Sequence, residues 1–174
     1  EVIPGHEIAG RIVAGDPENL ATRRLGLGDR VVVEQILRCG ACRYCIDDAY
    51  WMCQPQDIFG YKRHANGAMA DYMLLPQNAR VHRIDAAIPA AHAAFAEPLS
   101  CSAHAVERAG IRFRDVVVVA GCGPIGLGMI IGSRAKSPRL IIALDVSPSR
   151  LELARACGAD VVIDISAGDA VDEV

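Results

Sequence analysis

The feature that most constrains the fold of this chain is a group of four closely spaced cysteines, Cys39, Cys42, Cys45 and Cys53. The gaps between them are two, two and seven residues. Gaps this short let one loop surround a single metal ion, and four thiolates saturate tetrahedral zinc with no open position, which predicts a structural zinc site. An iron–sulfur cluster is the alternative, but a ferredoxin run continues with three residues and Cys-Pro, whereas Gln54 follows the last cysteine here.

Composition indicates a globular protein of a reducing compartment. The 174 residues are 52% hydrophobic and 22% charged, with a net charge of -3, and the charges form no basic tract that would suit nucleic acid. The three remaining cysteines stand singly in apolar surroundings, as buried free thiols do in the cytosol: Cys101, Cys122 and Cys157. The uncharged run 116–133 is interrupted by glycines and a proline, so we expect no membrane span. We expect no signal peptide and a cytoplasmic protein.

Hydrophobic patterning divides the chain into two halves. Short β-branched runs bounded by Gly and Asp predict strands over residues 8–14 and 30–36. Further strands are expected over 70–75 and 80–84, separated by a turn at 76–78. The cysteine stretch 38–60 lacks periodicity and is expected to be a loop held by metal. An Ala-rich helix is expected over 90–109, ended by Gly110, and the domain boundary falls within it.

The second half alternates apolar strands with helices. The expected elements are a strand at 115–120 that is buried on both faces, a helix at 124–135, a strand at 140–144, a helix at 148–157 and a strand at 160–165. This βαβαβ order is half of a doubly wound nucleotide-binding sheet.

A glycine motif lies at the first strand-to-helix turn of this half. Gly121 would make the tight turn, Gly123 would let the backbone approach a pyrophosphate, and Gly126 would let helix and strand pack closely. Asp145 follows Gly126 by 19 residues (145 − 126) and ends the next strand. Its carboxylate would accept hydrogen bonds from ribose hydroxyls and repel a 2′-phosphate, which predicts NAD over NADP.

Three further residues are candidate metal ligands. His6 and Glu7 are adjacent, so in a strand they would point to opposite faces, and both could reach one metal only at a bend. Glu97 stands in an apolar stretch, where a carboxylate is costly to bury without a partner. A metal ion is one such partner, and a helix N-cap or a local salt bridge is another.

Taken together, the chain resembles the zinc-dependent medium-chain dehydrogenase/reductase family along nearly its whole length. Residues 4–10 look like the family's catalytic-zinc segment, residues 28–31 like its strand entry, and the four cysteines like its structural-zinc lobe. The run 97–105, Glu-Pro-Leu-Ser-Cys-Ser-Ala-His-Ala, is most similar to the polyol (sorbitol-like) and threonine dehydrogenase branch. Classical alcohol dehydrogenases carry a cysteine zinc ligand where Glu97 stands.

The resemblance implies an α/β plus β fold. Residues 1–88 would form a GroES-like β-barrel catalytic domain with its zinc lobe at 38–60, and residues 89–110 a connecting helix. Residues 111–174 would form the first half of a Rossmann doubly wound parallel sheet that binds NAD.

The resemblance also implies roles for single residues. His6 would bind a second, catalytic zinc, Glu7 would be a ligand or the partner of one, and Glu97 would bind the zinc or hold its water. The reaction would be hydride transfer from a secondary alcohol carbon to NAD⁺, with zinc as Lewis acid. The residues expected to contact NAD are Gly121, Gly123, Pro124, Ile125, Gly126, Asp145 and Arg150.

In this family the first catalytic-zinc ligand is a cysteine upstream of the His-Glu pair, and the sequence begins after that position. We therefore expect an internal portion of a subunit about twice as long, inactive alone, whose complete form is a homodimer or homotetramer. Its partner would be a small alcohol or polyol, and neither nucleic acid nor a membrane. The alternatives are an L-threonine 3-dehydrogenase-like enzyme and a non-catalytic zinc- and NAD-binding module.

Overall fold

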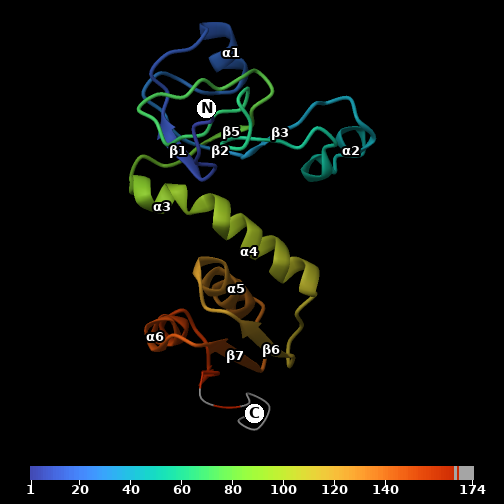
Figure 1. Cartoon of the computed structure of the whole chain (residues 1–174), viewed down its shortest axis with the longest axis vertical. Coiled ribbons are helices and arrows are strands. Elements are labelled where there is room, and N and C mark those ends of the chain that lie inside the picture. Colours follow the sequence, from blue (N-terminus) through green and yellow to red (C-terminus); the bar gives the residue numbers. More distant parts are fainter. Residues whose placement is uncertain (167, 169–174) are drawn as a thin grey trace. The chain divides into compact units, whose positions relative to one another are not determined.

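The computed structural model describes residues 1–166 and 168, which form two compact units, Glu1–Glu97 and a second unit that begins at Pro98 (Figure 1). Each unit has its own cluster of buried apolar side chains. The predicted division at 88 and 110 stays a prediction, and the last residues of its segment 111–174 lie outside the described ones. Among the described helices, none is long and apolar enough to cross a membrane.

Antiparallel strands organise the first unit. Its strands are β1 (Ile8–Arg11), β2 (Arg30–Val33), β3 (Ile36–Leu37), β4 (Asp57–Ile58) and β5 (Val81–Arg83). One sheet has the order β1-β2-β5, and β3 pairs with β4. Alternate residues of β2 are buried, so Val31 and Val33 face the interior, where Val33 packs with Ile8, Leu37 and Phe59.

The strand predictions for the first unit are partly wrong. The strand predicted over 8–14 ends at Arg11, and the strand predicted over 30–36 is interrupted after Val33. Residues 70–75 form no strand, and the segment Ala-Asp-Tyr-Met-Leu-Leu contains no β-branched residue that would favour one.

Short helices occupy segments that were expected to be irregular. The helix α1 (Pro17–Thr22) was not predicted, although Asp16 caps it by accepting the Asn19 N–H at 2.9 Å and Pro17 stands at a first helical position. The cysteine loop contains α2 (Arg43–Ile46) and the 3₁₀ turn η1 (Tyr50–Met52).

The helix expected over 90–109 is two helices, α3 (Ala90–Ala94) and α4 (Ala96–Ala109). The interruption at Phe95 follows from Pro98, which has no N–H to donate to the carbonyl four residues before it. Gly110 ends α4 with a φ of 63°, which confirms the predicted cap.

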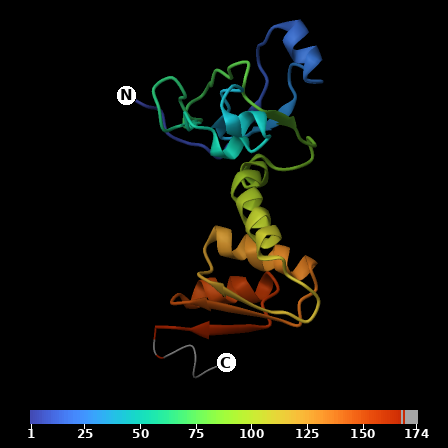
Figure 2. The same cartoon turned by 90° about the vertical axis from the view of Figure 1, so that its right-hand side faces the viewer.

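The second unit confirms the predicted βαβαβ order. Its elements are β6 (Val116–Ala120), α5 (Pro124–Ala135), β7 (Leu140–Asp145), α6 (Pro148–Ala156) and β8 (Val161–Asp164). The strands are parallel in the order β6-β7-β8 (Figure 2). The two helices cover one face of this sheet, where Ile141 and Ala143 pack with Ile130, Leu151 and Ala154.

Burial of β6 on both faces is the prediction that fails here. Val116 is 44% exposed and Val118 is 55% exposed, whereas Val119 on the opposite face is buried. Among the described residues, α5 and α6 pack on the face of Val119, and β6 stands at the edge of the sheet. The valine run therefore has one buried and one exposed face.

Candidate metal centres and nucleotide site

The four cysteines meet at one point of the cysteine loop. One sulfur from each lies within 4.8 Å of the others, and the Sγ atoms of Cys39 and Cys45 are 3.9 Å apart. Tetrahedral zinc with Zn–S bonds of about 2.3 Å requires sulfur separations of about 3.8 Å. Cys42 and Cys45 lie at the start and within α2, and Cys53 follows η1, so the two short helical turns fold the loop around this point. Four sulfur donors fit a closed zinc site.

Backbone amides and burial divide the thiols into two kinds. The backbone N–H of Gln54 is the main cause that lowers the pKa of Cys42 to about 6, with further contributions from Cys45. The N–H groups of Ala41 and Cys42 lower the pKa of Cys39. Burial acts in the opposite direction on Cys53 and raises its pKa to about 12. The thiolate forms of Cys39 and Cys42 are therefore favoured before a metal binds.

A second candidate metal centre joins His6, Glu7 and Glu97, whose ligand atoms all lie within 4.8 Å of one another. The chain bends at Glu7, directly before β1, which supplies the bend that two adjacent ligands need. Glu97 lies in the first turn of α4. The structure thus brings Glu97 to His6, which lies 91 positions earlier in sequence (97 − 6). One imidazole and two carboxylates form a hard donor set that fits zinc and leaves a fourth position open.

Glycines hold the backbone that carries His6. The N–H of Gly67 donates to the Ile3 carbonyl at 2.7 Å, and the N–H of Ala68 donates to the Gly5 carbonyl at 2.9 Å. A Cβ at Gly67 would lie 2.2 Å from the Gly5 oxygen, and one at Gly60 would lie 2.9 Å from the Gly5 nitrogen. Side chains at these two positions would displace the segment. Sequence reasoning missed this contact, for which Asn66-Gly67 is only a turn signal.

Tyr61 lies beside the second centre. Its ring centroid is 5.6 Å from that of His6, and the two rings are tilted by 59°. The phenol side chain is 63% exposed, so it packs against His6 on one side and faces solvent on the other. Sequence analysis did not identify it, because nothing in the local pattern around residue 61 indicates contact with residue 6.

The glycine motif forms a tight strand-to-helix turn in the second unit. Gly121 has a φ of 90°, and a Cβ at Gly126 would lie 1.9 Å from the Gly121 carbonyl oxygen. A Cβ at Gly123 would meet nothing within 4 Å, so open space lies in front of the N-terminus of α5. Pro124 and Ile125 follow in the first turn of α5. The helix end presents free backbone N–H groups to this space, which suits an anion.

Asp145 connects this turn to the end of β7. Its carboxylate accepts the Cys122 N–H at 2.7 Å and the Ser147 N–H at 2.9 Å, and it is 5% exposed. Those two backbone donors, Cys122 first, hold the pKa of Asp145 below its usual range, with a further contribution from the Arg150 guanidinium. The Nη1 atom of Arg150 is 3.9 Å from Asp145 Oδ2.

Ser102 holds the other side of the turn and was missed by sequence analysis. It is fully buried in α4, and its hydroxyl lies 2.9 Å from the Ile125 carbonyl and 3.1 Å from the Pro98 carbonyl, to either of which it can donate. A Cβ at Gly128 would lie 2.5 Å from this hydroxyl oxygen. The first turn of α5 is thereby fixed against α4.

Comparisons with known proteins give similarity over the whole chain. Residues 1–86 match the alcohol dehydrogenase GroES-like domain. The chain is 59% identical to erythritol/L-threitol dehydrogenase of Mycolicibacterium smegmatis, over 97% of this chain and 47% of that protein. It is 33% identical to L-threonine 3-dehydrogenase of Symbiobacterium thermophilum, over 98% of this chain and 46% of that protein. The chain thus spans about half the length of the curated relatives it matches.

A solved structure is similar over nearly the whole chain as well. A protein described as a zinc-binding dehydrogenase from Sinorhizobium meliloti 1021, bound to NADP, superposes with a TM-score of 0.90 at 30% identity, over 99% of this chain and 49% of that one. The domain match and this neighbour confirm the predicted fold class.

Proposed function

Because the chain belongs to the zinc-dependent medium-chain dehydrogenase/reductase family, we propose that the complete protein transfers a hydride from a secondary alcohol carbon of a polyol to NAD⁺. The observation that carries this proposal is the convergence of His6, Glu7 and Glu97. A metal centre with an open position, in the same chain as a glycine turn at a helix N-terminus, supplies what alcohol oxidation by a dinucleotide needs.

The two metal centres have different roles in this proposal. The four cysteines hold a structural zinc, since their donor set leaves no position for a substrate. His6, Glu7 and Glu97 hold the catalytic zinc, which when bound acts as a Lewis acid that lowers the pKa of an alcohol. The glycine contacts at residues 60 and 67 keep His6 in place, and Tyr61 shields one side of its ring from water.

The nucleotide is bound by the second unit. Its pyrophosphate lies in the open space at Gly123, against the N–H groups of the first turn of α5. Asp145, kept ionised by two backbone donors, accepts hydrogen bonds from the adenosine ribose and repels a 2′-phosphate, and Arg150 lies over the adenosine end. NAD is therefore the proposed cofactor, although the neighbouring structure from Sinorhizobium meliloti holds NADP.

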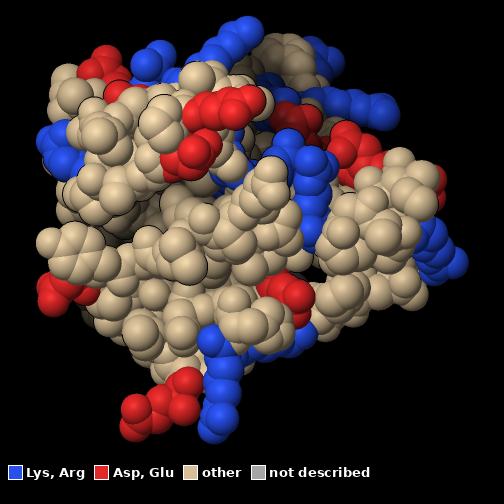
Figure 3. All heavy atoms as spheres, turned by 90° about the horizontal axis from the view of Figure 1, so that it is seen from above, with Lys and Arg blue, Asp and Glu red and all other residues tan. Residues whose placement is uncertain are grey.

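The substrate is a small polyol. Identity of 59% to an erythritol/L-threitol dehydrogenase favours a four-carbon polyol. L-Threonine is the second candidate, because an L-threonine 3-dehydrogenase is among the relatives at 33% identity. Acidic and basic side chains are interspersed on the face shown in Figure 3, which favours a small molecule over nucleic acid as the partner. A cytoplasmic homo-oligomer completes the proposal.

The test follows NADH formation by the protein at its complete natural length, with erythritol, L-threitol, sorbitol, L-threonine and simple alcohols. Turnover of a polyol that a zinc chelator abolishes is the expected result, and threonine turnover alone would favour the second candidate. Glu97→Gln should lower kcat/KM by about 100-fold or more and reduce zinc content from two ions towards one. Glu107→Gln, an exposed change in the same helix, should alter neither quantity.

One outcome would contradict the proposed reaction, and another would contradict only the expected inactivity of this chain alone. If the complete protein binds zinc and NAD yet oxidises no alcohol, it is a non-catalytic module, and the proposed reaction is wrong. The 174 residues alone should form no NADH, so turnover by this chain at ordinary enzymatic rates would show that the metal centre needs no ligand from outside it.

A further inference from the structure

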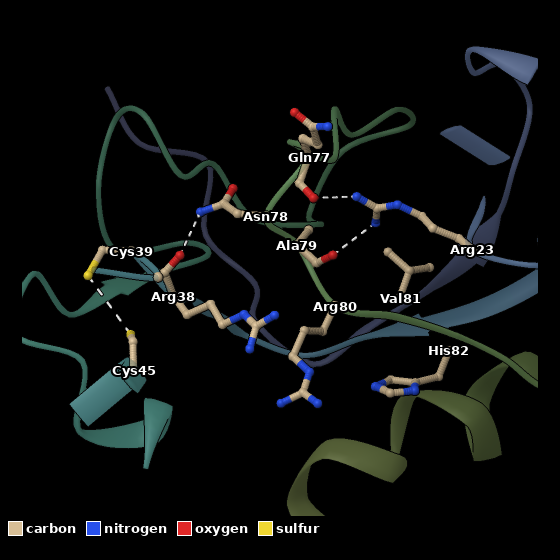
Figure 4. A pocket seen from close by; sticks show the side chains of 11 residues that line it. Arg23, Arg38, Cys39, Cys45, Gln77, Asn78, Ala79, Arg80, Val81 and His82 are labelled. Atoms are coloured by element: carbon tan, nitrogen blue, oxygen red, sulfur yellow. Dashed lines mark hydrogen bonds between the residues drawn. The ribbon is translucent and has the colours of Figure 1, made fainter. Parts of the chain in front are cut away.

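A cavity of about 580 Å³ in the first unit carries a concentration of positive charge that the proposed reaction does not use. No Asp or Glu lines it, and four basic side chains do: Arg23, Arg38, Arg80 and His82. The polar side chains of Gln77 and Asn78 complete its wall (Figure 4). A volume of this size accommodates a small metabolite.

The basic side chains are not equally engaged. Arg23 donates to the carbonyls of Gln77 and Ala79 and thereby fixes the loop that precedes β5. Arg80 forms a long ion pair with Glu34, at 3.5 Å from Nε, and its guanidinium lies 4.4 Å from the centre of the Tyr50 ring. Its two terminal nitrogens have no hydrogen bond within the described part of the chain.

Arg38 and His82 have no side-chain partner among residues 1–166. The side chain of Arg38 extends away from Cys39 and Cys45 and towards Arg80 (Figure 4). Its guanidinium therefore does not serve the sulfur cluster, although the two cysteines form part of the same wall. Glu34 pairs with Arg80 but does not line the cavity, so an anion inside the cavity would still be attracted by both guanidinium groups.

Guanidinium groups favour one class of anion. Each presents a planar fork of N–H donors that matches two oxygens of a phosphoryl group, whereas a single carboxylate occupies one fork. We propose that this cavity is a binding site for a phosphoryl dianion, either inorganic phosphate or the phosphate end of a small ester. Arg38 and Arg80 hold the oxygens, and His82 and Gln77 line the remaining space.

The test titrates inorganic phosphate into the zinc-loaded protein by calorimetry, in a phosphate-free buffer of low ionic strength. NAD⁺ is present at saturation, so that the glycine turn of the second unit is occupied. We expect one phosphate site, weakened about tenfold or more by Arg38→Gln, since a hydrogen bond to a charged group contributes about 1.5–3 kcal/mol. Arg63→Gln makes the same charge change at an exposed position of the same unit and should leave the affinity unchanged.

Other results would overturn the proposal. If NAD⁺ abolishes the heat of phosphate binding, phosphate binds at the glycine turn. If Arg63→Gln weakens phosphate binding as much as Arg38→Gln does, the binding is general charge attraction. If Arg38→Gln lowers zinc content and leaves phosphate affinity intact, the arginine serves the cysteine cluster. Glycerol 3-phosphate distinguishes the two sources: tighter binding than inorganic phosphate supports an ester, and equal affinity supports recognition of the phosphoryl group alone.

Discussion

At the scale of single residues, glycines set the geometry of the His6 centre and of the glycine turn, but for two different reasons. Gly67 and Gly126 stand where another backbone comes too close for any side chain, with an added Cβ at 2.2 Å and 1.9 Å from a carbonyl oxygen. Gly123 stands where the protein leaves open space. The first kind of glycine is required by the fold, and we propose that the second kind is required by the nucleotide.

This difference predicts opposite behaviour for two alanine substitutions in one motif. Gly126→Ala should destabilise the second unit by about 1–3 kcal/mol, because the new methyl group overlaps the Gly121 carbonyl oxygen. Gly123→Ala should cost less than about 1 kcal/mol, as an N-cap change, yet weaken NADH binding at least tenfold. Urea unfolding and NADH fluorescence titration measure the two effects. Equal loss of stability in both variants would contradict this explanation.

The sequence predicts the ligands of both metal centres better than it predicts what supports them. Cysteine spacing and the family resemblance indicate all seven candidate ligands, and the structure brings each set within 4.8 Å. Ser102 and Gly67 could not be predicted, because their importance arises from contacts with Ile125 and Gly5, which are remote in sequence. Local patterns carry no information about such pairs.

At the scale of elements, strand boundaries in the second unit are fixed by polar links as well as by the hydrophobic pattern. Asp160, just before β8, accepts the Ile141 N–H of β7 at 2.8 Å, and its other oxygen is 2.6 Å from Arg134 Nη2 of α5. One carboxylate thus joins α5, β7 and the start of β8. The apolar pattern predicted these elements well, whereas the first unit, whose short strands depend on pairing with remote partners, was predicted less well.

The Asp160 link should make stability depend on pH. The Ile141 N–H, followed by Arg134, holds the pKa of Asp160 below its usual range. The carboxylate therefore stabilises the fold fully above its unfolded pKa of about 3.9, and this contribution is lost as pH falls through the lower folded pKa. Asp160→Asn should unfold at lower urea than wild type at pH 7, with the difference shrinking below about pH 4. Asp71→Asn, an exposed control, should follow wild type at every pH.

At the scale of the whole molecule, the chain consists of two units with separate cores and separate candidate ligand sites. The buried cluster around Phe59 belongs to the unit with both candidate metal centres, and the cluster around Ile130 belongs to the unit with the glycine turn. Since binding stabilises the unit that contains the site, zinc and dinucleotide should act on different parts of the chain.

Hydrogen exchange can measure this separation. Removal of zinc should lower amide protection within residues 1–97, most strongly in the cysteine loop, because metal binding contributes to the folding of such a loop. Addition of NAD⁺ should raise protection after residue 98, first around the glycine turn. A Cys53→Ser variant should show the lowered protection of the cysteine loop without a chelator. If NAD⁺ protected the cysteine loop as strongly as the glycine turn, the two units would not be independent.

The exposed valines of β6 affect how copies of this chain associate in solution. A strand at the margin of a sheet offers unpaired amides and carbonyls, and Val116 and Val118 add an apolar surface beside them. Such a margin is a template on which another molecule can add a strand, and β-branched side chains make the addition favourable. At high concentration, copies of this chain should therefore aggregate by strand pairing at β6, and a charged substitution at Val118 should reduce this aggregation.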